Sequence, residues 1–143
     1  MKSGVTPEMT PELTAADYAV LADFRHALRR FLVFSEGQAA TFGLTPQQHQ
    51  ALLALKAAEP GSATVGHLAE RLILKPHSAS GLVDRLMALG LLERQPNPAD
   101  RRQALLRLTD KAEAVLSSLT AIHAEEIRRL RPLLMAMLEK VGS

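Results

Sequence analysis

The residues best suited to a chemical role lie at the start of a helix that we expect to run from Pro76 to Leu89 in this 143-residue chain. Small and basic side chains should face outward in its first turns: Lys75, His77, Ser78, Ser80, Gly81 and Arg85. Small side chains let a helix approach a ligand closely, and the free N–H groups at a helix N-terminus favour an anion. This pattern suits insertion into the major groove of DNA, and it equally suits an ordinary solvated surface.

A second candidate contact follows in the loop that carries Asp100, Arg101 and Arg102. Two short apolar stretches flank this loop, residues 91–94 and 104–108, and we expect them to pair as a hairpin. The two prolines and one asparagine between them exclude a continuous helix. One arginine of such a tip can enter a minor groove while the other contacts phosphate, and Asp100 can orient either guanidinium. Together with the preceding helix, the pair favours DNA binding over a neutral scaffold.

Three short helices must position these residues. Thr45-Pro46 predicts the start of a helix that ends near residue 58, with Leu52, Leu53 and Leu55 inward. A second helix is expected over 64–72, then a break over 73–75, then the helix that begins at Pro76, whose inward residues are Ala79, Leu82, Val83, Leu86 and Leu89. With the hairpin, these helices predict a winged helix-turn-helix lobe over residues 45–109.

Two long helices flank the predicted lobe, over residues 14–44 and 110–143. Thr14 with Asp17 marks the first start, and Tyr18 and all four phenylalanines of the chain fall in the first helix. We expect the last helix to break or kink at Pro132. The apolar faces exceed what a small lobe can cover, so we expect dimerisation helices that pair two copies; folding back as a monomer is the alternative. Residues 1–13 are predicted to form a flexible arm.

Charge and composition narrow the class of protein. Residues 45–109 hold eight basic and five acidic side chains, against four and five in 1–44 and five of each in 110–143. A local positive surplus suits contact with phosphate. The absence of cysteine excludes disulfides, thiolate zinc sites and thiol redox switches. With no apolar run of about 20 residues and no secretory signal, we expect a cytoplasmic protein without a membrane partner.

The stretch LILKPHSASGLVDRLMALGLLERQPNPADRRQALLRLT resembles the winged helix of the MarR family of bacterial transcriptional regulators, and the layout agrees over almost the whole chain. The signature lies between Gly90 and Thr109, in Arg94, Pro96, Asn97, Asp100, Arg101, Arg102, Leu108 and Thr109. The resemblance implies an obligate homodimer with intertwined first and last helices. It also implies that Arg102 is the minor-groove arginine and Arg101 its basic neighbour. Lys111-Ala112 departs from the family, where a glycine is common, and His77 and Gly81 lie where sequences vary.

The resemblance further suggests a small-molecule effector pocket between the dimer helices and each reading lobe. Its candidate lining residues are Phe31, Phe34, Phe42, His49 and Leu53. An ordinary core role for these residues is the alternative. The five histidines lie on separate segments, and Ser35 and Ser78 have no neighbouring base in sequence, so we predict no metal site, no cofactor and no enzyme activity.

The sequence therefore predicts a mainly α fold with a small β-hairpin wing. The expected function is that of a homodimeric, ligand-responsive repressor that binds double-stranded DNA at a palindromic operator. A winged helix that binds a protein partner without DNA is the first alternative. An enzyme or sequestering protein for a small molecule on the same scaffold is the second, and the missing catalytic residues disfavour it.

Overall fold

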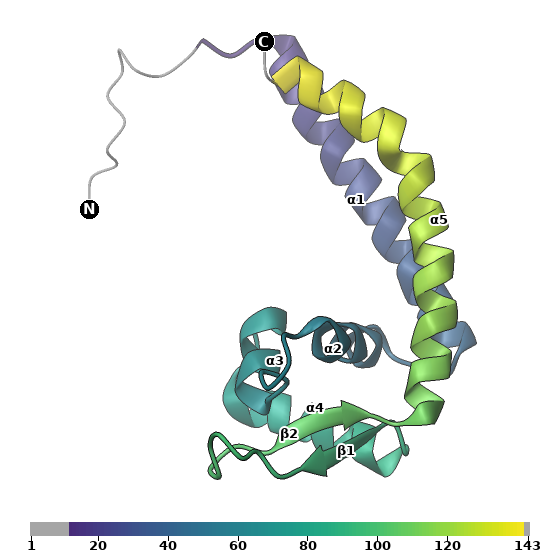
Figure 1. Ribbon diagram of the computed structural model, residues 1–143. Coiled ribbons are helices and arrows are strands. Elements are labelled where there is room, and N and C mark those ends of the chain that lie inside the picture. The colour runs from purple at the N-terminus through teal and green to yellow at the C-terminus, as the bar shows by residue number, and fades with distance from the viewer. Residues whose placement is uncertain (1–11, 142–143) are drawn as a thin grey trace. The chain divides into compact units, whose positions relative to one another are not determined.

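The computed structural model describes residues 12–141, which fall into two compact units. The first unit holds residues 12–33 and 125–141, and the second holds residues 34–124. Two long helices, α1 (Ala15–Thr41) and α5 (Asp110–Val141), contribute to both units (Figure 1). Except for residues 12 and 13, the predicted flexible arm lies outside the described residues.

The second unit contains the segment predicted as a winged helix-turn-helix lobe, residues 45–109, together with the end of α1 and the first part of α5. Between α1 and α5 it contains α2 (Pro46–Ala57), α3 (Val65–Leu72), α4 (Pro76–Ala88), β1 (Leu92–Gln95) and β2 (Leu105–Leu108). The two strands pair antiparallel, with Leu92 opposite Leu108 and Gln95 opposite Leu105. Helix, strand and loop order agree with the sequence prediction. β1 is displaced by one residue from the predicted range 91–94, and β2 begins one residue later than the predicted range 104–108 and ends at the same residue.

Polar side chains fix the starts of the helices. The Thr45 hydroxyl accepts a hydrogen bond of 3.1 Å from the Gln48 amide, and the Thr45 amide donates to Gln48 Oε1 at 3.0 Å. This reciprocal capping box satisfies two amides that the first turn of α2 leaves without a carbonyl. Thr14 and Asp17 make the same kind of contact before α1, where the Thr14 amide donates to Asp17 Oδ2 at 2.8 Å. Both predicted helix starts are confirmed.

The core of the lobe forms around the inner face of α4. Its buried side chains are Ala79, Leu82, Val83 and Leu86, and they join buried leucines of α2, α3 and the hairpin. Burial of one such leucine contributes about 2 kcal/mol. Two residues predicted to face inward do not, because Leu53 and Leu89 are 44% and 45% exposed. Leu53 is rotated about 100° from its buried neighbour Leu52, and Leu89 follows the last residue of α4.

Backbone bonds attach the hairpin to the helices. The Leu106 amide donates to the Ala63 carbonyl at 2.7 Å, which ties β2 to the segment before α3. At the base of the hairpin, the Thr109 hydroxyl donates to the Gly90 carbonyl at 2.7 Å, and Lys111 Nζ donates to the Leu89 carbonyl at 3.1 Å. Both carbonyls lie at the end of α4, where helix carbonyls lack intrahelical partners. The hairpin is therefore anchored at both its outer edge and its base.

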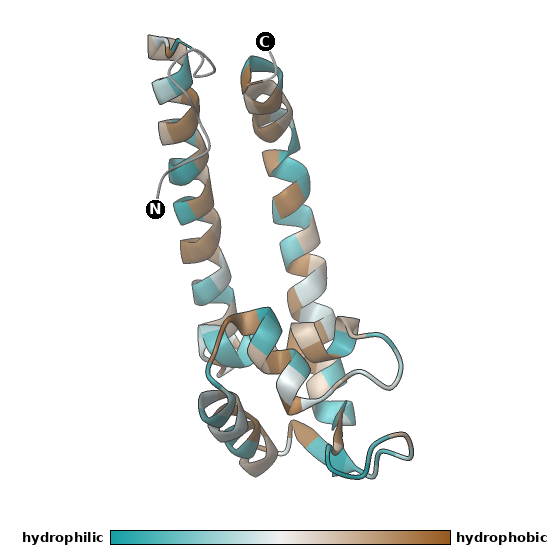
Figure 2. Ribbon diagram, turned by 90° about the vertical axis from the view of Figure 1, so that its left-hand side faces the viewer, coloured by the Kyte–Doolittle hydropathy of each residue, from teal (hydrophilic) through white to brown (hydrophobic). Residues whose placement is uncertain are grey.

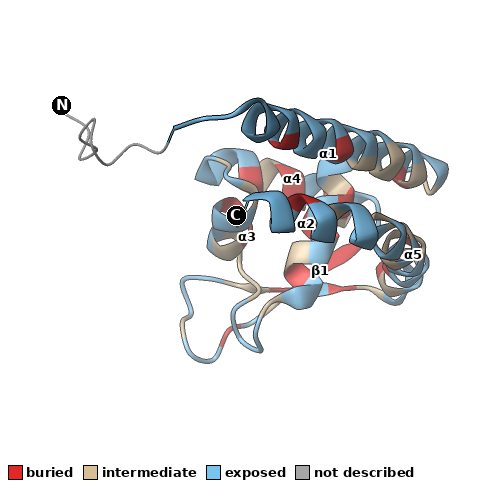
Figure 3. Cartoon of the chain, turned by 90° about the horizontal axis from the view of Figure 1, so that it is seen from above, coloured by how far each residue is buried: buried red, intermediate tan, exposed pale blue. Residues whose placement is uncertain are grey.

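The first unit has a small core and a large apolar surface. Val20 and Ala27 of α1 and Met137 of α5 are buried there, with Leu134 packed against them. Most residues of the α1 segment are exposed (Figure 3), and apolar residues alternate with polar ones along both helices (Figure 2). Exposed large apolar residues in this unit include Tyr18, Leu21, Phe24, Leu28, Leu133 and Leu138. Within the described residues, no helix is both long and apolar enough to cross a membrane.

Helix α5 continues through Pro132 to Val141. The helix does not break at this proline, because a proline removes only one backbone donor and the hydrogen bonds on either side continue the helix. The kink that was the other expected outcome stays a prediction. Two ion pairs between residues three apart lie along α5 in the first unit. Arg128 Nη2 lies 2.8 Å from Glu125 Oε2, and Arg129 Nη1 lies 3.7 Å from Glu126 Oε1.

We predict that replacing Ile73 by glycine stabilises the protein. Ile73 caps the end of α3 with φ 55°, a left-handed conformation that is strained for a β-branched residue, and its side chain is 92% exposed. Ile73→Gly should raise the free energy of unfolding in urea by about 1 kcal/mol, because strain is released and little burial is lost. Ile73→Ala keeps the Cβ atom and should gain much less. Equal effects of the two variants would contradict a strained turn.

Candidate DNA-binding site

Helix α4 presents a row of small and basic residues on its outer surface. Lys75 is the N-cap residue of this helix but makes no side-chain capping bond, and Pro76 occupies the first helical position. Ser78, Gly81 and Arg85 follow at spacings of three and four, which places them in one row along the helix. Lys75, His77, Ser78 and Arg85 are exposed, and Ser80 and Gly81 are half-buried. All six predicted residues of this helix start thus lie clear of the deep core.

The loop between β1 and β2 projects from the lobe and carries a bidentate ion pair at its tip (Figure 1). Arg102 Nε donates to Asp100 Oδ1 at 3.2 Å, and Arg102 Nη2 donates to Asp100 Oδ2 at 3.4 Å. The backbone amide of Arg102 donates to the same carboxylate at 3.0 Å. These hydrogen bonds lower the pKa of Asp100. The Arg102 side chain is nevertheless 90% exposed, so Asp100 orients the guanidinium without covering it.

A buried asparagine shapes this loop. Asn97 Oδ1 accepts a hydrogen bond of 3.1 Å from the Ala99 amide, and the Asn97 carbonyl accepts from the Asp100 amide at 3.3 Å. Such an asparagine side chain closes a tight turn by replacing a backbone carbonyl. In the sequence, Asn97 stood out as a helix-breaking residue between the two strands and as part of the family resemblance. The structure gives it a physical role, which is to hold Asp100 in place for Arg102.

An ion pair that the sequence analysis missed joins α4 to the hairpin. Arg94 Nη2 on β1 lies 3.4 Å from Asp84 Oδ1 on α4, and both side chains are largely exposed. The signal was available, because these opposite charges are ten residues apart on either side of the turn at Gly90. This ion pair engages the carboxylate of Asp84, the residue next to Arg85 in the sequence. It connects β1 to the outer side of α4.

The five candidate pocket residues have different surroundings within the two units. Phe31 belongs to the first unit, whereas Phe42 packs against the core of the lobe. Leu53 lines a different hollow of about 610 Å³, together with residues of α5 that include Leu116 and Thr120. Phe34 and His49 belong to a common cluster within the lobe.

That cluster centres on His123 of α5. His123 Nδ1 lies 2.7 Å from the Leu119 carbonyl, so this nitrogen carries the proton, and Nε2 accepts from the Ser35 hydroxyl at 2.8 Å in the neutral ring. The His49 ring centre lies 4.9 Å from that of His123, and the Phe34 ring packs edge-on at 5.7 Å. The sequence analysis found no base near Ser35, because its partner lies 88 residues away.

Burial lowers the pKa of His49, and the neighbouring His123 lowers it further. His49 is only 5% exposed. Within residues 12–141, the structure contains no group of three or more histidine, aspartate and glutamate side chains that could hold a metal ion.

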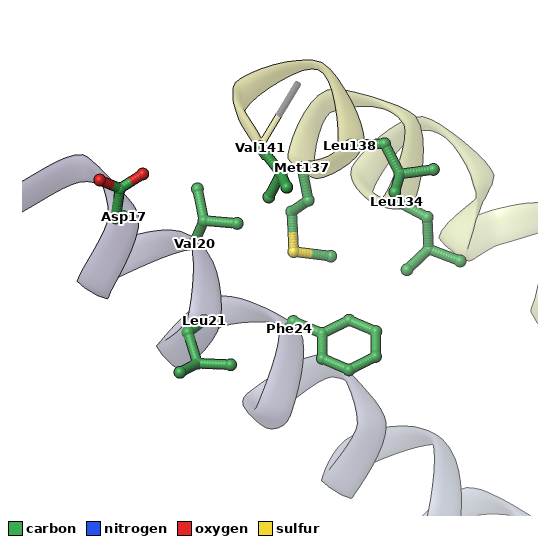
Figure 4. A pocket seen from close by; sticks show the side chains of 8 residues that line it. All are labelled: Asp17, Val20, Leu21, Phe24, Leu134, Met137, Leu138 and Val141. Atoms are coloured by element: carbon green, nitrogen blue, oxygen red, sulfur yellow. The ribbon is translucent and has the colours of Figure 1, made fainter. Parts of the chain in front are cut away.

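The first unit presents a separate apolar hollow of about 340 Å³. Figure 4 shows its lining side chains: Asp17, Val20, Leu21, Phe24, Leu134, Met137, Leu138 and Val141. All but Asp17 are apolar. A hollow of this composition in an exposed helix pair is typical of a surface that another apolar element covers.

The geometry defines a winged helix-turn-helix protein, and comparison with known proteins supports a particular family. The family model described as MarR family matches residues 42–103, from the end of α1 through the hairpin loop. The transcriptional repressor MdtR of Bacillus subtilis is 41% identical over 86 residues, which are 57% of this chain and 54% of MdtR. The repressor NicR of Pseudomonas putida is 29% identical over 83% of this chain and 76% of its own length. These matches show that the chain is similar to MarR-family repressors, with the family model matched over the lobe, and that it spans about half the length of MdtR.

A solved structure agrees with the fold over most of the chain. A mutant MarR from E. coli, crystallised with operator DNA, superposes with a TM-score of 0.64 at 19% identity. The match covers 92% of this chain and 99% of that protein. At this identity the likeness establishes the fold, which is mainly helical with a two-stranded wing. The predicted fold class is confirmed.

We predict that His49 makes the protein sensitive to acid. Its pKa is lowered in the folded state, so the unfolded chain takes up the proton first as the pH falls below about 6.5. The contribution of His49 to stability is therefore complete above that pH and is lost below it. In urea unfolding at pH 7.5, 6.0 and 5.0, His49→Leu should lose less stability on acidification than the wild type. The exposed His26 supplies a control, and His26→Gln should show the same fall of the unfolding free energy with pH as the wild type. An equal fall in all three proteins would assign the acid sensitivity to groups other than His49.

Proposed function

We propose that this chain is a sequence-specific DNA-binding transcriptional regulator that acts as a homodimer. The observation that carries the proposal is the combination, within one small lobe, of the small and basic row on α4 with the exposed, carboxylate-oriented Arg102 at the hairpin tip. The first is suited to a major groove and the second to the adjacent minor groove. MdtR and NicR are both described as transcriptional repressors, which supports the same role here.

The two elements have different tasks on a DNA duplex. The first turns of α4 bring backbone N–H groups and the side chains of Lys75, His77, Ser78 and Ser80 to bases and phosphates. Arg102 enters the minor groove, where a narrow width strengthens the negative potential. The Arg101 side chain makes no hydrogen bond or ion pair within residues 12–141, and it supplies a second positive charge near the DNA backbone. Asp100 restricts the rotation of Arg102 before binding, which reduces the entropy lost on contact.

A second copy of the chain is the proposed partner of the first unit. Its apolar hollow and the exposed Leu21, Phe24 and Leu138 leave more apolar surface in contact with water than a monomer ordinarily keeps. In a two-fold dimer the same patch of each copy faces the other, so pairing buries this apolar surface on both copies. It also presents two α4 helices to one face of DNA, about 34 Å apart, so the operator is a palindrome.

We further propose that the regulator is a cytoplasmic repressor whose DNA affinity responds to a small molecule. Phe34 of α1, His49 of α2 and His123 of α5 form an aromatic and polar cluster within the lobe. The cluster therefore joins three helices at one point. A ligand that binds one arrangement of these helices more tightly shifts the dimer toward that arrangement. A screen of small aromatic acids and amines in which none alters DNA affinity would remove this part of the proposal.

Two other functions are less well supported. If the winged helix bound only proteins, the exposed Arg102 that Asp100 orients would have no explanation. An enzyme needs a reactive group with access to substrate, and Ser35, the residue with a histidine base, is half-buried in the aromatic cluster. We therefore propose no catalytic role.

Replacing Arg102 by alanine tests the wing. If the guanidinium enters the minor groove, Arg102→Ala should weaken binding to a selected operator by about 1–3 kcal/mol. Fluorescence anisotropy of a labelled duplex measures the change across salt concentrations. Arg131→Ala removes the same charge from an exposed position on α5 in the first unit and serves as the control. If both variants lose affinity equally, the wing has no specific role, and a wild-type protein that binds no duplex would overturn the function.

A charge in the apolar hollow tests the dimer. Leu138→Glu places a carboxylate among Leu134, Met137 and Val141, so analytical ultracentrifugation should show a monomer at micromolar concentration where the wild type is a dimer. The matched control is Ala136→Glu, two positions earlier in α5 on an exposed part of the helix that does not line the hollow. A wild-type monomer, or an unchanged dimer in Leu138→Glu, would contradict the proposed interface.

A further inference from the structure

Gly81 has no evident structural reason to be glycine. It lies in the middle of α4, and its φ is not among the positive values recorded for other glycines of the chain. A Cβ atom added there would meet one side chain only, Arg85, whose Nη1 would lie 3.6 Å away in ordinary van der Waals contact. Alanine would therefore fit, and it favours a helix more than glycine does. The fold gains nothing from the missing methyl group, so its benefit must lie in something that approaches from outside.

Arg85 lies across the surface that Gly81 leaves open. Its side chain extends back toward the start of α4, as long side chains on helices do, and brings the guanidinium beside residue 81. Asp84, the adjacent carboxylate, is paired with Arg94 instead. Within residues 12–141, the Arg85 side chain makes no hydrogen bond or ion pair, so its five N–H donors are available to an external partner.

This inference rests on the proposed function, in which α4 enters a major groove. There, the planar guanidinium of an arginine matches the O6 and N7 acceptors of guanine with two parallel hydrogen bonds. A flat helix surface at residue 81 allows the base edge to come close enough for that contact. We propose that Gly81 and Arg85 form the base-reading unit of this regulator, and that the unit selects a guanine at one position in each half of the operator.

Selection of binding sites from random DNA duplexes tests the proposal. The wild type should enrich a palindrome with a guanine at one symmetric position. Arg85→Ala should lose the preference at that position alone, with a drop of about ten-fold to a hundred-fold in affinity for the selected duplex and little change for duplexes with another base there. Arg131→Ala, which removes a charge from the first unit, should keep the wild-type preference.

Gly81→Ala separates reading from folding. The variant should unfold at a higher temperature than the wild type, because alanine stabilises the helix, and yet bind the selected duplex at least several-fold more weakly. A preference for guanine that survives in Arg85→Ala, or an equal loss for all sequences as expected of a phosphate contact, would overturn the base-reading role while leaving the proposed function intact. Unchanged operator affinity in Gly81→Ala would overturn the role of Gly81. A wild type that enriches no sequence would overturn the proposed function itself.

Discussion

The inner face of α4 is held against α2, α3 and the hairpin by four apolar side chains, and the orientation of its outer face depends on this contact. Ala79, Leu82, Val83 and Leu86 are all buried. A turn of the helix by a single residue, about 100°, would bring a leucine to the surface and lose about 2 kcal/mol for that side chain alone. The apolar core therefore fixes the row formed by Ser78, Gly81 and Arg85, although none of these residues contributes much to the core.

The hairpin is held by a different kind of force. Its leucines pack into the same core, whereas its tip and its outer edge are organised by hydrogen bonds and exposed ion pairs. An exposed pair such as Asp84–Arg94 contributes at most about 1 kcal/mol, so it orients groups more than it stabilises the fold. This division suits the proposed contact with DNA, because the apolar scaffold stays rigid while the charged groups remain available to exchange partners.

Much of the lobe could be predicted from sequence, because local signals specify it. Thr45 with Gln48 marks a helix start through contacts three residues apart, and the prolines between the two apolar stretches exclude helix. Errors arose where a distant part of the chain decides the outcome. Leu53 looks like a core residue until the packing of Leu52 and Leu55 fixes the angle of α2, and the partner of Ser35 could not be found from spacing because it lies on α5. The roles of the predicted DNA-contacting residues and the second copy remain predictions, since they depend on molecules other than this chain.

The junction between the wing and α5 contains almost no spare chain. β2 ends at Leu108 and α5 begins at Asp110, which leaves Thr109 alone between them, and its hydroxyl and amide are bonded to Gly90 and Leu91. A flexible linker would absorb a tilt of the first turns of α5, but one tethered residue cannot. Any such tilt must either break those bonds or be passed directly to the strand that leads back to the arginine tip, so this junction works as a stiff mechanical coupling.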